Sequence, residues 1–155
     1  MKLLLFLLPV LLLIACGNAQ TAEPQPQIPS GYLYKVEPGI PGKSVYVCGE
    51  RPFDVTGKLV GPDNLEQQTI QVFENIKTAL KTVNMTMADV TQITYSIKTN
   101  KTAGLPNKVD VTMMTQVSNV ATSYLVVPPQ IIDSKAVGQI IRDDVLIEIE
   151  VIAVK

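Results

Sequence analysis

The sequence contains no histidine in its 155 residues. A Ser-His-Asp or Cys-His catalytic arrangement and a zinc site of the HExxH type each need at least one imidazole. The chain therefore excludes these sites and most transition-metal sites. Acid–base chemistry in this protein must use carboxylates, lysine, tyrosine, cysteine or a bound water molecule.

Excess positive charge is also lacking. The chain has 13 lysines and arginines against 14 aspartates and glutamates, and its formal net charge is −1. No block or stripe of basic residues interrupts this balance. The sequence therefore offers no electrostatic basis for a nucleic-acid partner.

Cysteine is scarce, and Cys16 and Cys48 are the two present. Cys16 ends the sequence L-I-A-C, which follows Lys2 and an apolar run too short to span a bilayer. This pattern resembles the lipobox of bacterial lipoprotein signal peptides. An ordinary secretory signal with an incidental cysteine is the alternative. With Cys16 lipidated, no disulfide can form within the chain, so stability must come from packing and oligomerisation.

The lipobox resemblance implies cleavage before Cys16 and acyl chains on its sulfur and its new amino group, which together anchor stably. We expect a signal peptide at residues 1–15, a Pro- and Gln-rich lipidated tether at 16–30 and one domain at 31–155. Gly17, rather than aspartate, follows the cysteine, so retention at the inner membrane is not indicated. The expected address is the periplasmic face of the outer membrane.

Hydrophobic periodicity predicts an α+β domain with both helices on one face of a sheet. The clearest helix begins at the capping sequence 63–66 and ends at Asn84. The last two strands are expected to form a hairpin around a tight turn at residues 142–144. The full order is β-β-α-β-α-β-β, with strands at 31–37, 44–49, 90–98, 133–141 and 145–154 and helices at 63–84 and 107–124.

The last strand has two unlike faces, because side chains alternate along a strand. Its apolar face should lie on the core and carries Ile147, Ile149, Val151 and Ala153. Its other face carries Glu148 and Glu150 among aliphatic residues. Carboxylates are seldom buried without a partner. These two glutamates therefore line a cleft or a subunit contact, or they are solvated.

Three stretches resemble the RidA/YjgF family of small trimeric proteins. The first follows the family motif Ser-Gly-Gln-x-Pro, the second the first family helix, and the third the terminal family strand. They are residues 45–61 (VYVCGERPFDVTGKLVG), 67–80 (QQTIQVFENIKTAL) and 147–154 (IEIEVIAV). The resemblance covers most of residues 32–155.

This resemblance implies a chorismate-mutase-like fold in which three sheets close into a barrel with the helices outside. The chain would then form a homotrimer that binds a small molecule in the clefts between subunits. Many family members hydrolyse 2-imino acids, which are enamine/imine intermediates of amino-acid metabolism, to 2-keto acids and ammonia. They use neither a metal nor an organic cofactor.

The family residues map onto this chain one by one. A gapless count places the glutamate that positions the attacking water at Glu148. The Ser-Gly pair falls on Cys48 and Gly49, so a thiol replaces a hydroxyl. The tyrosine on the substrate side falls on Tyr34 or on Tyr32.

The arginine that grips the substrate carboxylate is replaced, because the Arg-Ser pair of the family falls on Asp133 and Ser134. An acidic side chain at this place disfavours anion binding. Lys135 and Arg51 are the nearby cations that could supply the missing charge, or they could be a solvated lysine and a rim arginine. Cys48 is an inert thiol in the simplest interpretation.

Two functions therefore remain open from the sequence. The first is imine deaminase activity, weak or lost because of Asp133. The second is a non-catalytic, lipid-anchored trimer that binds a small ligand. The membrane is contacted only through the N-terminal lipid in both.

Overall fold

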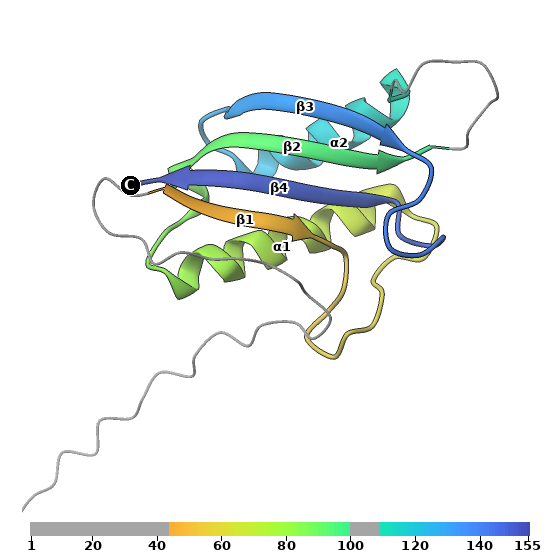
Figure 1. The fold of residues 1–155 in the computed structure, drawn as a ribbon, viewed down its shortest axis with the longest axis horizontal. Helices are drawn as coiled ribbons and strands as arrows, with labels where there is room; N and C mark the ends of the chain where they lie inside the picture. The colour runs from red at the N-terminus through yellow and green to blue at the C-terminus, as the bar shows by residue number, and fades with distance from the viewer. Residues whose placement is uncertain (1–43, 100–108) are drawn as a thin grey trace, which may run out of the picture.

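The computed structural model describes residues 44–99 and 109–155. Within these residues a four-stranded sheet packs against two α-helices (Figure 1). The elements in chain order are β1 (Ser44–Glu50), α1 (Leu65–Thr82), a 3₁₀ turn (Met87–Asp89), β2 (Val90–Lys98), α2 (Val111–Tyr124), β3 (Gln130–Val137) and β4 (Ile147–Val154). This mixed sheet with two helices confirms the predicted α+β class.

The strand order across the sheet is β1-β4-β2-β3. β4 pairs antiparallel with both β1 and β2, whereas β2 and β3 are parallel. Parallel neighbours need a crossover connection, and α2 supplies it between β2 and β3. Both helices lie behind the sheet in Figure 1, as the sequence predicted, and its other face is bare of described elements.

The predicted hairpin of the last two strands is wrong. β3 occupies Gln130–Val137 rather than residues 133–141, and it pairs with β2 instead of β4. The crossover through α2 brings the chain back parallel to β2 at the sheet edge, and β4 enters between β1 and β2. The link between β3 and β4 is therefore the longer segment 138–146 rather than a tight turn.

The first predicted helix is confirmed, and its ends have local causes. The side chain of Asn64 accepts a hydrogen bond from the Gln67 amide at 3.0 Å, which caps the N-terminus. After the helix ends, Asn84 has φ of 58°, the left-handed conformation that often terminates helices. The second helix begins at Val111 rather than residue 107, because Asp110 caps it by accepting from the amides of Thr112 and Met113.

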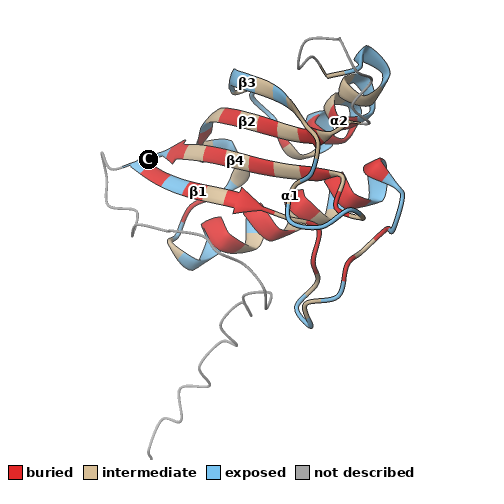
Figure 2. Cartoon of the chain, turned by 45° about the vertical axis from the view of Figure 1, so that its right-hand side comes forward, coloured by how far each residue is buried: buried red, intermediate tan, exposed pale blue. Residues whose placement is uncertain are grey.

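The core lies between the helices and the inner face of the sheet (Figure 2). All four apolar residues predicted to face the core from the last strand are at most 1% exposed. Phe73 of α1 is fully buried and stacks on Tyr124 of α2, with ring centroids 5.1 Å apart. Burial of one such aromatic side chain stabilises the fold by about 2–3 kcal/mol. This stack therefore joins the two helices into one layer.

The predicted first strand, the tether, Tyr32, Tyr34 and Cys16 lie outside the described residues. Among the residues that the structure does describe, no helix has both the length and the apolar character needed to cross a membrane.

Candidate functional site

An ion pair joins the loop after β1 to the outer face of β4. The Nε of Arg51 donates a hydrogen bond to the Oε2 of Glu148 at 2.6 Å. The two side chains are 17% and 16% exposed, respectively. A partly shielded ion pair is weakened less by solvent than a surface pair. This contact brings together two of the residues that the sequence proposed for the site.

The end of β1 shapes the approach of Arg51 to β4. Pairing between β1 and β4 shifts between Val47 and Glu50, and Gly49 has φ of 67° at this irregularity. Such a conformation favours glycine. A Cβ on Gly49 would lie 3.5 Å from the carboxyl carbon of Glu148 and 3.6 Å from an Nη of Arg51. Gly49 therefore belongs to the same site as the ion pair.

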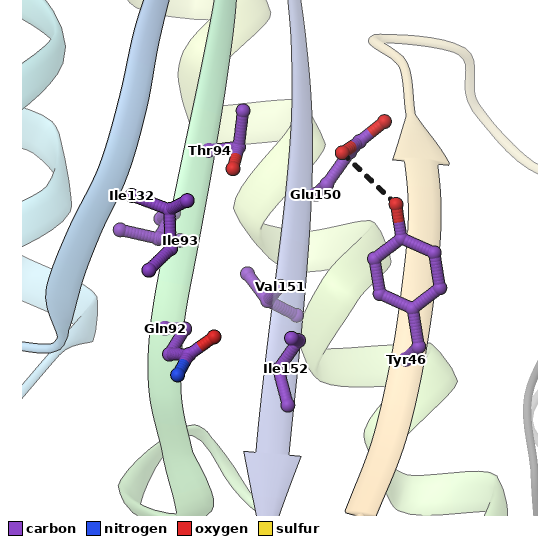
Figure 3. Close-up of a pocket in the computed structure, with 8 residues that line it drawn as sticks. All are labelled: Tyr46, Gln92, Ile93, Thr94, Ile132, Glu150, Val151 and Ile152. Atoms are coloured by element: carbon purple, nitrogen blue, oxygen red, sulfur yellow. Dashed lines mark hydrogen bonds between the residues drawn. The ribbon is translucent and has the colours of Figure 1, made fainter.

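A second polar contact lies on the same face, further along β4. The hydroxyl of Tyr46 donates to the Oε2 of Glu150 at 3.0 Å (Figure 3). Burial, together with hydrogen bonds to Cys48 and Glu150, raises the pKa of the Tyr46 hydroxyl. Cys48 thus lies beside a tyrosine and is half-buried. The thiol is a hydrogen-bond partner of the Tyr46 hydroxyl, and the inert role of Cys48 stays a prediction.

The outer face of the sheet is hollowed next to this contact, as Figure 3 shows. The groove has a volume of about 340 Å³. It is lined by residues of all four strands, namely Tyr46, Gln92, Ile93, Thr94, Ile132, Glu150, Val151 and Ile152. The groove is mostly apolar and is separate from the ion pair of Arg51 and Glu148.

β3 places its two charged residues in different rows of the sheet. Lys135 is in register with Ser96 of β2, and Ser96 is in register with Glu148. Asp133 is in register with Thr94, one row further along. Strands are spaced about 4.8 Å apart, so β2 separates both charges from Glu148 by roughly 10 Å. Asp133 therefore does not adjoin Glu148 as a hairpin partner would.

Ser134 lies on the opposite face from Asp133 and Lys135. It borders a shallow hollow beside α2, with Val109, Val111, Met114, Thr115 and Ser118. Successive residues of a strand point to opposite faces, so Ser134 is directed toward the helix layer. Of the predicted site residues, Glu148, Arg51 and Gly49 therefore lie together. Lys135 and Asp133 lie two strands away on the same face of the sheet, and Ser134 lies on the opposite face.

Three buried polar residues lie near the site, and the sequence pattern does not predict that they do. Glu50 is 1% exposed and precedes Arg51 directly. Gln68 and Asn75 of α1 are 0% and 5% exposed. The helix motif contains both amides, but nothing in their spacing shows that they face the loop and β4. Over the described ranges 44–99 and 109–155, no cluster of three or more potential metal ligands occurs.

Comparisons with known proteins agree with this fold. The family model named endoribonuclease L-PSP matches residues 30–155. A RutC family protein of Saccharolobus solfataricus is 34% identical over 115 residues, which are 74% of this chain and 81% of that protein. A candidate endoribonuclease of Thermotoga maritima has a crystal structure with a TM-score of 0.65 and 28% identity, covering 84% of this chain and 93% of its own. Escherichia coli TdcF with bound serine has the same TM-score at 20% identity, covering 84% and 94% of the two chains.

Proposed function

Because the chain belongs to the RidA/YjgF family, whose model bears the name endoribonuclease L-PSP, we propose that it hydrolyses 2-imino acids to 2-keto acids and ammonia. Glu148 is the proposed catalytic residue. It would orient the attacking water, accept a proton from it and return that proton to the departing nitrogen. One water is consumed, the C=N bond becomes C=O, and ammonia leaves.

The single observation that supports this proposal is the contact between Arg51 and Glu148. It holds a carboxylate on the open sheet face with a guanidinium directly beside it. A guanidinium is the cation best suited to hold a carboxylate substrate. Arg51 comes from the loop after β1 and not from β3, so a substrate carboxylate would bind on the opposite side of Glu148 from Asp133. Bound serine in the TdcF structure shows that this fold can hold an amino acid.

We do not assign RNA cleavage to this chain, despite the name of the family model. The sequence has no histidine and a net charge of −1. Nucleic-acid binding depends largely on clustered cations that neutralise phosphates, and the sequence has no block of lysines and arginines. A small anionic substrate needs only one well-placed cation.

The test is the decay of freshly generated 2-iminopropanoate, measured as ammonia released above the spontaneous rate. We expect slow turnover by the native protein. Glu148→Gln should abolish it, because a neutral amide cannot accept a proton from water. Glu150→Gln is the matched control, since Glu150 lies on the same face of the same strand but contacts Tyr46. Equal turnover by the native protein and Glu148→Gln would refute the role of Glu148.

The second candidate is a non-catalytic, ligand-binding module. The observation that favours it is the same short contact, because a carboxylate already held by Arg51 has one oxygen engaged. Calorimetric titration with 2-oxobutanoate, a stable analogue of the substrate, separates the two functions. Binding without any acceleration of imine decay would support the module.

We also propose that the chain works as a lipid-anchored homotrimer outside the cytoplasm. The lipobox-like sequence ending at Cys16 motivates the anchor. Globomycin, which blocks the lipoprotein signal peptidase, should cause the uncleaved precursor to accumulate. A soluble product of unchanged size in the cytoplasm would contradict the anchor.

A further inference from the structure

Helix α1 presents two buried amide side chains toward the site. Gln68 and Asn75 are about two turns apart, so they lie on one side of the helix. A buried amide without partners is costly. Both side chains make hydrogen bonds outside their own helix, and these bonds go to the two segments that carry the ion pair.

Asn75 holds the loop that carries Arg51. Its Nδ2 donates to the backbone carbonyl of Arg51 at 2.8 Å and to that of Phe53 at 3.0 Å. Its Oδ1 accepts from the side chain of Gln71 at 2.9 Å. This third bond orients the amide, so that its nitrogen faces the loop. The backbone of Arg51 is therefore tied to α1.

Gln68 holds the chain that leads into β4. Its Nε2 donates to the carbonyl of Asp144 at 2.7 Å and to that of Gly61 at 3.1 Å, and its Oε1 accepts from the amide of Leu146 at 2.7 Å. Leu146 precedes Glu148 by two residues. Hence the start of β4 and the far end of the loop after β1 are tied to the same helix.

We propose that Gln68 and Asn75 are positioning residues that set Arg51 against Glu148. Each acts through the backbone of the segment it holds. Helix α1 is thus a common template for two residues that are 97 positions apart in the chain. The catalytic consequence rests on the proposed function, but the positioning itself does not.

The ion pair can be observed directly by NMR on the ¹⁵N-labelled full-length protein in detergent, through hydrogen exchange of the Arg51 Nε–H. We expect this proton to exchange slowly in the native protein. Asn75→Leu keeps the side-chain volume but removes the donor, so exchange should accelerate about fivefold to tenfold, the loss expected for one or two hydrogen bonds. Gln68→Met should act in the same direction from the β4 side.

Thr69→Val is the matched control. Thr69 is fully buried on the same helix, and its hydroxyl bonds to the carbonyl of Leu65 within α1. This variant loses one buried hydrogen bond without releasing the loop or β4, so Arg51 exchange should stay within about twofold of native. Equal acceleration by Thr69→Val and Asn75→Leu would overturn the proposal, because general loosening would then explain both.

Fast exchange in the native protein, or native exchange in both folded amide variants, would also overturn it. If Asn75→Leu does not fold, Asn75→Ser replaces it. Serine is too short to reach both carbonyls, so exchange of the Arg51 Nε–H should again be faster than in the native protein, and native exchange would overturn the proposal. In the imine assay Asn75→Leu should raise KM and lower kcat, because it loosens the loop of Arg51, the proposed substrate cation. Gln68→Met acts on the chain that leads to Glu148 and should lower kcat with a smaller change in KM. An inactive native protein would refute the proposed function, while the exchange measurements would still decide the positioning role.

Discussion

Glu50 has an unusual environment for a carboxyl group at the end of a strand. It is 1% exposed, and its Oε2 has no hydrogen-bond partner among the described residues. Burial raises the pKa of its carboxyl from 4.5 to about 8, and the positive charge of Arg51 opposes this increase. Within the described residues, Arg51 is the charged group that acts on it. Glu50 is therefore protonated at neutral pH in the folded state.

Folding stability should consequently depend on pH through Glu50. The folded protein holds this proton up to about pH 8, whereas the unfolded chain releases it near pH 4.5. Stability due to this group is complete below pH 4.5 and declines as pH rises to 8, by roughly 3–5 kcal/mol. We expect Glu50→Gln to remove this decline and to raise the melting temperature at pH 8. Thermal unfolding from pH 5 to 9 measures it.

Glutamine is a suitable substitute because it is neutral, nearly isosteric and the residue of the family motif at this place. Glu66→Gln, which changes an exposed glutamate of α1, serves as the control and should leave the pH dependence intact. If native protein and Glu50→Gln lost stability in parallel between pH 5 and 8, another group would be responsible.

At the scale of elements, the position of β3 decides how Asp133 affects the site. β3 is an edge strand paired only with β2 among the described strands, and Asp133 is in register with Thr94. Asp133 is exposed on the same face of the sheet as Glu148. β2 lies between the two residues, and they are offset by one pair of residues along the strands. A long side chain at this place can still reach over β2 toward the site, so its charge remains relevant.

We therefore expect Asp133→Arg to improve binding of 2-imino acids and their analogues. The change removes a negative charge and adds a fork-shaped cation on the site face. Because residue 133 lies two strands from Glu148, the gain comes from attraction across roughly 10 Å and should be about twofold to fivefold in affinity for 2-oxobutanoate by calorimetry. Glu66→Arg alters the net charge equally from the helix side and should have no such effect. Unchanged affinity in Asp133→Arg would show that β3 does not reach the ligand.

At the scale of the whole molecule, the outer face of the sheet exposes apolar side chains that another subunit could cover. Tyr46, Ile132 and Val154 on the strands of this face are 41%, 52% and 42% exposed, and the apolar groove lies among them. Apolar surface of this kind marks interaction sites in soluble proteins. Closure of three such faces into a barrel, as in the family, would cover it.

We expect light scattering at micromolar concentration to give the mass of a trimer. Ile152→Glu, which adds a charge to the groove, should shift the mass toward a monomer because a buried unpaired charge is costly. Val111→Glu, at a residue of α2 that is 79% exposed, should leave the mass unchanged. A monomeric native protein would contradict the trimer.

The sequence by itself determined several features that depend on neighbours along the chain. The alternation in residues 147–154, the helical spacing after Asn64 and the turn at Asn84 each follow from side chains within one or two turns. Their predicted burial and ends are confirmed with shifts of a few residues. The family motifs belong to the same class of local signal, and they identified Glu148 as the residue to examine.

Only the tertiary structure decided what lies beside Glu148. The pairing of β3 with β2 depends on the path of the crossover, which no local period encodes. Three features depend on segments that are far apart in sequence. They are the contact of Arg51 with Glu148, the burial of Glu50, and the hydrogen bonds of Gln68 and Asn75. Such contacts depend on which segments pack together, because charge and amide groups find their partners in space rather than along the chain.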